Sequence, residues 1–122
     1  MTRMEEFTIE GKSFFSIDFS GIISNKDFID LTNTAKLIIA KYPKHSLYTV
    51  SNISNIRGDT QTKEIFHKYL EHNKPYVKHG AIIGVDGIKK MMAKTIMKLT
   101  GRKDFHYAYS REEAIEWLLL QD

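Results

Sequence analysis

Five histidines are the side chains of this sequence best suited to binding a metal or acting as a general base, because a neutral imidazole offers a nitrogen lone pair. They are His45, His67, His72, His79 and His106. Two histidines on a helix share a metal when they are four residues apart, as in the His-Glu-x-x-His pattern. His67 and His72 are five apart, on different sides of a helix, and the chain has no cysteine to add a thiolate ligand. We therefore expect scattered surface histidines, with no metal site and no cofactor.

Groups for nucleophilic or acid–base catalysis show no better spacing. No serine lies in a Gly-x-Ser-x-Gly elbow. The adjacent glutamates Glu5-Glu6 and Glu112-Glu113 fall at the expected starts of elements, where they favour a helix dipole or are solvated. Although residues distant in the sequence can still meet in the fold, we expect the chain not to be an enzyme.

A glycine-flanked turn at residues 84–87, Gly-Val-Asp-Gly, precedes a predicted helix. The start of a helix is a natural place for a phosphate, because free amides and the dipole favour an anion. This turn matches neither the dinucleotide-binding fingerprint nor the Walker loop, and Asp86 would repel a phosphate. We interpret it as a strand-to-helix turn with a good N-cap.

A basic face on the helix predicted for residues 88–99 is the one feature that suggests nucleic-acid binding. Its lysines are Lys89, Lys90, Lys94 and Lys98. No aromatic side chain is interleaved with them to stack a base, and the formal net charge of the chain is only +3. A solvated helix face explains these lysines more simply, so nucleic acid remains the weaker alternative.

Length and composition predict one domain over residues 1–122, large enough for a hydrophobic core. The polar N-terminus lacks the apolar stretch of a secretory signal, and no apolar run is long enough to span a bilayer. The absence of cysteine is compatible with a reducing compartment. We expect a cytoplasmic protein with no membrane span. We find no internal repeat, linker or low-complexity segment.

Hydrophobic periodicity and turn residues predict the order β-β-α-β-α-β-α-β-α. The expected strands cover residues 6–11, 13–19, 46–53, 80–85 and 105–109, and the expected helices cover residues 25–42, 60–73, 88–99 and 111–120. Ser110 and Glu113 form an expected capping box. The first two strands are too close in sequence for a parallel crossover, whereas the helices join the later strands at crossover length. The predicted fold is α/β, a mixed, mostly parallel five-stranded sheet with an antiparallel N-terminal edge strand and four helices.

Two apolar residues of the first predicted helix, Ile29 and Leu37, fall outside its core stripe. Polar Asn33 lies between them, so they do not form a continuous second stripe. Singly exposed apolar residues are normal, and this is the simpler interpretation. The alternative is a contact with a second copy of the chain, which would make a homodimer.

Several strings of the sequence resemble the small SpoIIAA-like domains. They are Pro75-Tyr-Val-Lys78, then residues 80–90 (GAIIGVDGIKK), residues 99–105 (LTGRKDF) and residues 110–118 (SREEAIEWL), with IDFSG at 17–21 and IAKYP at 39–43. These domains are relatives of the STAS domain of anti-sigma-factor antagonists, and their superfamily fold also occurs in Sec14-type lipid-binding proteins. The resemblance covers most of the chain and implies a STAS-like fold with a regulatory, protein-binding role.

The resemblance also implies a site. In the antagonist relatives, a phosphorylatable serine follows the third strand at the start of the next helix, where a phosphate gains from the helix dipole. The matching contact residues here are Ser54, Arg57, Asp59, Thr60 and Thr62. The family's paired serine followed by glycine is missing from this loop, which favours capping hydroxyls on an ordinary helix.

The lipid-binding relatives imply an alternative function, binding of a small apolar ligand. Aromatic residues expected at the sheet could line its pocket; they are Phe14, Phe15, Tyr48, Tyr107 and Tyr109. Against this alternative, so short a chain commits most of its apolar side chains to the core, and a shared fold is a weak warrant for a shared function.

Overall fold

The computed structural model of the chain describes residues 2–56, 59–85 and 105–122. Its elements in chain order are β1 Met4–Ile9, β2 Lys12–Asp18, α1 Asn25–Ile39, β3 Leu47–Asn52, α2 Thr60–Asn73, β4 Val77–Ile83, β5 Phe105–Ala108 and α4 Arg111–Leu119. The helix predicted for residues 88–99, with Lys89, Lys90, Lys94 and Lys98, lies outside the described residues, as does Arg57. The described part therefore contains three helices of the expected four.

The five strands form one mixed sheet in the order β1-β2-β3-β4-β5. The pair β1–β2 is antiparallel, and the other neighbouring pairs are parallel. This confirms the predicted sheet with its antiparallel edge strand. The hairpin turns through Glu10 and Gly11, which have φ angles of 52° and 79°. Two consecutive positive φ angles are what a tight two-residue hairpin loop requires.

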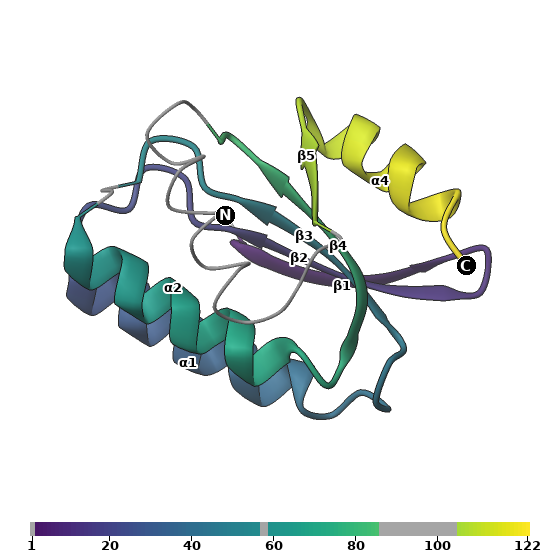
Figure 1. Ribbon diagram of the computed structural model, residues 1–122, viewed down its shortest axis with the longest axis horizontal. Coiled ribbons are helices and arrows are strands. Elements are labelled where there is room, and N and C mark those ends of the chain that lie inside the picture. Colours follow the sequence, from purple (N-terminus) through teal and green to yellow (C-terminus); the bar gives the residue numbers. More distant parts are fainter. Residues whose placement is uncertain (1, 57–58, 86–104) are drawn as a thin grey trace.

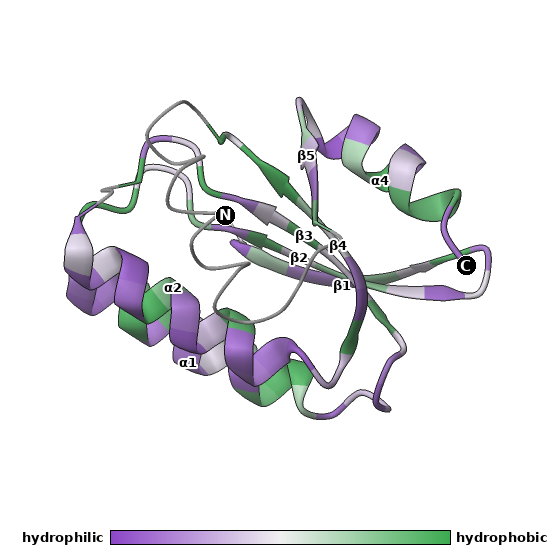
Figure 2. Ribbon diagram, viewed as in Figure 1, coloured by the Kyte–Doolittle hydropathy of each residue, from purple (hydrophilic) through white to green (hydrophobic). Residues whose placement is uncertain are grey.

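Helices α1 and α2 lie side by side on one face of the sheet, and α4 lies on the other (Figure 1). The visible outer side of α2 is mostly hydrophilic (Figure 2). Beneath the helix pair lie Phe15 and Ile17 of β2 and Phe19, the residue that follows the strand, and all three are buried. The rings of Phe19 and Phe28 stack with centroids 4.8 Å apart, so the segment after β2 is joined to α1 by aromatic contact.

The end of α1 comes earlier than predicted. The helix ends at Ile39 instead of residue 42. The Ala40 amide still bonds to the Lys36 carbonyl, four residues back. The next two amides bond to carbonyls three residues back, from Lys41 to Ile38 and from Tyr42 to Ile39. Such bonds tighten the last turn of a helix and commonly terminate it.

The second face of the sheet packs under α4. Its buried residues include Phe14, Tyr48, Val50, Ala81, Ile83, Ala108, Ala114 and Leu118. Lys12 fixes the end of the helix, because its ammonium donates to the carbonyls of Leu119 at 2.8 Å and Gln121 at 2.7 Å. A cation at this position also complements the negative end of the helix dipole.

The start of α4 corrects one detail of the predicted capping box. The Ser110 hydroxyl accepts a hydrogen bond from the Glu113 amide at 3.1 Å, as expected. The Glu113 carboxylate, however, binds Nε2 of His106, with its two oxygens 2.9 and 3.1 Å away. In a capping box the Glu113 carboxylate would accept a hydrogen bond from the Ser110 amide. Here it binds the imidazole of His106, on β5, instead.

Candidate functional site

The ends of β2 and β3 carry the same five-residue turn. Residues 18–22 read Asp-Phe-Ser-Gly-Ile, and residues 52–56 read Asn-Ile-Ser-Asn-Ile. Oδ1 of Asp18 accepts from the Ser20 amide at 2.8 Å, and Oδ1 of Asn52 accepts from the Ser54 amide at 2.9 Å. Each is a local turn in which an Asp or Asn side chain caps the backbone two residues on.

The backbone that follows each serine also matches. Gly21 has a φ of 75° and Asn55 a φ of 59°, both in the left-handed region that glycine and asparagine tolerate best. Each turn then ends on a buried isoleucine, Ile22 or Ile56. The two turns share this conformation although only the serine and the isoleucine are identical, because Asp and Asn, Phe and Ile, and Gly and Asn replace one another.

The two turns are bonded to each other. The Phe19 amide donates to the Asn52 carbonyl at 2.8 Å, and the Gly21 amide donates to the Ser54 carbonyl at 3.0 Å. The guanidinium of Arg3 donates to the carbonyls of Asp18 and Ser20, both at 3.0 Å. Hydrogen bonding between the strands thus continues past their ends and makes this edge of the sheet one bonded unit.

Gly84 brings the end of β4 against the same unit. Its φ is 86°, and a Cβ placed on it would lie 2.6 Å from the backbone nitrogen of Ser54 and 2.7 Å from its Cα. Only a glycine allows both this conformation and this approach. The residue that follows β4 therefore lies close to the backbone of Ser54 in the predicted site. The rest of the turn predicted at residues 84–87 lies partly outside the described residues.

The start of α2 is tied to the start of α1 by polar side chains. Asp59 caps α2, with its Oδ1 accepting from the Thr62 amide at 2.8 Å. The Thr62 hydroxyl oxygen lies 2.8 Å from that same oxygen and 3.0 Å from Oδ1 of Asn25, and it can donate to only one of them at a time. Asn25, the first residue of α1, also bonds to Gln61 at 2.9 Å. The two helix starts are therefore held in fixed relation.

The described residues of the predicted contact set differ strongly in exposure. Asp59 and Thr60 are exposed, Ser54 is half-buried, and Thr62 is only 2% exposed. The structure brings Asp59 and Thr62 together with Asn25 of α1, whereas Ser54 packs on Gly84. Sequence reasoning missed Asn25, Gln61 and Gly84 as parts of this site, because their partners come from separate elements.

The pair Ile29 and Leu37 is exposed on α1, at 37% and 72% respectively. This agrees with their predicted place outside the core stripe, where Phe28, Ala35 and Ile39 are buried. The exposure is compatible with either a solvated helix face or a contact between copies.

The histidines are not all scattered on the surface, because His79 and His106 are partly buried and both contact the ring of Trp117. His67 lies 3.4 Å from Glu71 along α2, and His72 bonds to the Asn73 side chain at 2.9 Å. Within residues 2–56, 59–85 and 105–122, no three histidine or carboxylate side chains come together as metal ligands would. None of the described helices has the length and apolar character needed to cross a membrane.

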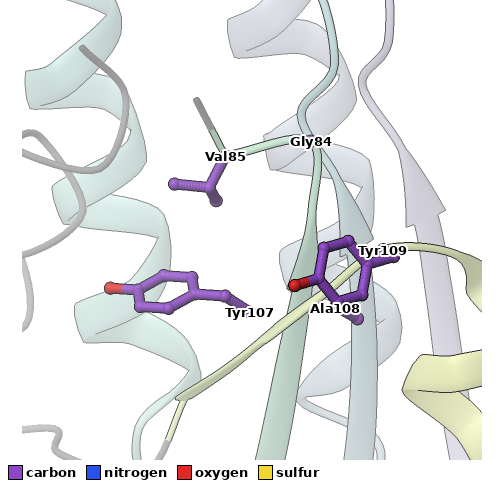
Figure 3. Close-up of a pocket in the computed structure, with 5 residues that line it drawn as sticks. All are labelled: Gly84, Val85, Tyr107, Ala108 and Tyr109. Carbon is purple, nitrogen blue, oxygen red and sulfur yellow. The ribbon is translucent and has the colours of Figure 1, made fainter. Parts of the chain in front are cut away.

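The five aromatic residues expected to line one pocket do not lie together. Phe15 lies on the α1–α2 face, whereas Phe14 and Tyr48 lie on the α4 face, and all three are buried in the core. Tyr107 and Tyr109 instead line a cavity of about 330 Å³ with Gly84, Val85 and Ala108 (Figure 3).

Sequence comparisons do not extend this picture. Neither the models of known protein families nor the curated proteins contain a match to this chain.

Proposed function

We propose that this chain is a cytoplasmic, non-enzymatic regulatory domain of the SpoIIAA-like (STAS-like) kind, which binds a protein partner at the carboxyl edge of its parallel strands. The contact would involve the loop from Ser54 to Thr62, including Arg57. The sheet order and the alternation of strands and helices support the fold expectation at the level of α/β architecture. The resemblance in sequence supplies the finer assignment.

The proposal rests on the arrangement of the residues at the start of α2. Thr60 is exposed at the first residue of the helix, while Thr62 is buried and bonded to Asp59 and close to Asn25. An exposed hydroxyl is thus presented on a frame that two helices hold in place. Preorganised surfaces lose less conformational entropy when a partner binds.

Phosphorylation of Thr60 would change this surface strongly. A phosphate adds roughly −1.5 to −2 charges at neutral pH. The helix dipole would favour that charge, whereas the neighbouring Asp59 carboxylate would oppose it. Thr62 is the poorer acceptor because its side chain is buried and bonded.

Affinity capture from the native cell tests the partner contact. We expect the wild-type chain to retain one protein that Thr60→Arg loses, with mass spectrometry identifying the protein and any phosphothreonine. Thr34→Arg is the matched control, because Thr34 is also an exposed threonine, on α1. Equal capture by all three chains would contradict the proposal.

The same proposal includes a homodimer contact at Ile29 and Leu37, which both project from α1 into solvent. Light scattering should report a dimer for the wild-type chain and a monomer for Leu37→Asp. A monomeric wild-type chain would remove this part of the proposal and leave the partner contact in place.

The alternatives draw less support. Lipid binding would need a long apolar channel, whereas Phe14, Phe15 and Tyr48 fill the two cores. Nucleic-acid binding through Lys90, Lys94 and Lys98 would be weakened by replacing these lysines and by added salt.

A further inference from the structure

The outer side of β1 is an open hydrogen-bonding edge. β1 is the first strand in the sheet order and pairs with β2 in a continuous register. In an antiparallel pair, alternate residues direct both their amide and their carbonyl to the partner strand. Arg3 does so, because its carbonyl accepts from the Asp18 amide at 2.7 Å. The residues that direct their backbone groups away from β2 are therefore Met4, Glu6 and Thr8.

These outward groups are accessible to another chain. Glu6 and Thr8 are exposed, and Met4 is half-buried. Within the described residues, β2 is the only strand paired with β1, and no backbone hydrogen bond occupies its outer side. Proteins commonly protect such an edge with proline, lysine or a bulge, and β1 has none of the three. The edge is therefore suited to accept a further strand, as in recognition by β-augmentation.

The charge of the edge favours a basic partner on one face of the sheet. Residues 4–11 contain three glutamates and no lysine or arginine, although the whole chain has a formal net charge of +3. The Glu6 carboxylate lies on the α1–α2 face, where it accepts from the Tyr42 hydroxyl. A neutral phenol does not neutralise the carboxylate. A cationic side chain placed opposite Glu6 therefore gains an ion pair.

The other face of the edge favours an apolar side chain. Phe7 lies there, stacked on Phe14 of β2 with ring centroids 5.1 Å apart. The guanidinium of Arg111 lies 5.0 Å from the centroid of the Phe7 ring and also binds Glu5. A second cation would be repelled at this place. A β-branched or aromatic side chain opposite Phe7 would instead extend the packed apolar surface.

We propose that β1 binds an extended segment of a partner protein as an additional strand, in which cationic and apolar side chains alternate. Main-chain hydrogen bonds hold the segment, its cations lie beside Glu6 on the α1–α2 face, and its apolar side chains lie against Phe7 on the α4 face. A second copy of β1 is the poorer occupant, because it brings three further glutamates to the joint. The site does not depend on the contact proposed at Thr60.

A short peptide in which lysine and valine alternate is the probe, and fluorescence anisotropy of its dye-labelled form measures the affinity. The wild-type chain should bind it, and the amides of Glu6 and Thr8 should exchange with deuterium more slowly in the complex. N-methylation of the lysine amides, which face β1 in this register, should abolish binding. N-methylation of the valine amides, which face solvent, should leave it intact. The same peptide with glutamate in place of lysine should not bind.

Thr8→Pro and Thr8→Ala are the matched variants of the chain. Proline removes the outward amide of Thr8 and leaves the bonds to β2, so the variant should fold but bind the peptide about tenfold more weakly or worse. Thr8→Ala keeps the amide and should bind as the wild type does. Glu6→Gln should weaken binding about twofold to fivefold, and high salt should remove the difference.

The proposal is overturned if the unmodified peptide does not bind, if both N-methylated peptides bind equally, or if folded Thr8→Pro binds as the wild type does. The unfolding temperature and NMR spectrum of Thr8→Pro verify its fold, and the two N-methylated peptides decide the question if it is unfolded. A wild-type dimer that Thr8→Pro separates and Leu37→Asp does not would place a second copy on the edge, which also overturns the proposal. Partner capture by the Thr60 surface would survive any of these results.

Discussion

The imidazole of His106 lies parallel to the indole of Trp117, with ring centroids 4.5 Å apart and an interplanar angle of 4°. Glu113, one helical turn before Trp117, binds Nε2 of the same imidazole at 2.9 Å. One side chain of edge strand β5 therefore holds α4 through both a stacking contact and a polar contact. Trp117 also touches His79 of β4 edge-on, at 6.3 Å.

This contact is the end of an aromatic row that crosses the whole sheet under α4. The successive ring pairs are Phe7–Phe14 at 5.1 Å, Phe14–Tyr48 at 5.6 Å and Tyr48–His79 at 5.8 Å, before the two contacts of Trp117. Each of the five strands contributes one ring. The row explains why a helix of nine residues stays docked, because its aromatic anchor joins a series of rings already packed on the sheet.

The first prediction concerns the His106–Glu113 pair. A double-mutant cycle with His106→Gln and Glu113→Gln should give a coupling free energy of about 1 kcal/mol, because the contact is short and both side chains are partly buried. Urea unfolding of the four chains measures it.

The pair His67–Glu71 is the control for this cycle. It is also a histidine–glutamate contact, but it is longer, at 3.4 Å, and its glutamate is 67% exposed. Its coupling should stay below about 0.5 kcal/mol, as for other exposed pairs on helices. A His106–Glu113 coupling no larger than this would show that the polar contact adds nothing to the stacking of His106 on Trp117.

The sheet could be predicted from the sequence because its signals are local. Alternation in β2 and the short turn before it each act within a few residues, and the structure confirms the strand and the antiparallel pairing that they imply. The fourth strand is present but covers Val77–Ile83 instead of residues 80–85. The end of α1 was missed because a tightened last turn leaves Tyr42 on the apolar side without continuing the helix.

The candidate site was predicted only in part because its contacts join distant residues. The sequence offers Asp59 or Thr60 as the cap of α2, and the structure assigns the cap to Asp59. Sequence spacing cannot show that Asn25 of α1 reaches Thr62 or that Gly84 packs on Ser54. At Glu113 the local motif predicts a contact that a more distant residue replaces. The capping serine is present, but the Glu113 carboxylate binds His106 instead of the serine amide.

Gly84→Ala is the second prediction. The substitution adds left-handed backbone strain and a Cβ that meets backbone atoms of Ser54 at 2.6 and 2.7 Å, so it should destabilise the chain by roughly 3 kcal/mol. Gly21→Ala is matched in φ, at 75°, with no atom within 4 Å of the added Cβ. It should cost only about 1 to 2 kcal/mol. Thermal and urea unfolding compare the two, and equal losses would mean that the Gly84–Ser54 contact yields easily.

The third prediction separates the two threonines of α2. Thr62→Ala removes a buried hydroxyl that bonds at the Asp59 cap and lies beside Asn25, and should cost about 1 to 3 kcal/mol in the free energy of unfolding. Thr60→Ala changes an exposed side chain and should stay within about 0.5 kcal/mol of wild type. A larger loss for Thr60→Ala would mean that Thr60 supports the fold, which would weaken its proposed role as a partner contact.

The last prediction concerns alkaline pH. The Tyr42 hydroxyl donates to Oε1 of Glu6 at 2.6 Å. Burial, this hydrogen bond and the Glu6 charge together raise the pKa of Tyr42 to about 12, whereas an unfolded tyrosine titrates near its ordinary value of about 10. The folded chain therefore holds this proton more tightly than the unfolded chain. The resulting stabilisation is complete below pH 10 and is lost as the pH rises from 10 to 12.

Urea unfolding of the wild-type chain and of Tyr42→Phe from pH 8 to pH 11.5 tests this sign. The stability difference between the two should be constant up to about pH 9.5 and should then shift against the wild type, because only the wild type carries the titrating group at position 42. The raised pKa of Tyr107 is common to both chains and cancels in the difference. A difference that stays flat to pH 11.5 would show that Glu6 does not retain the Tyr42 proton, and that β1 and the end of α1 are joined by packing alone.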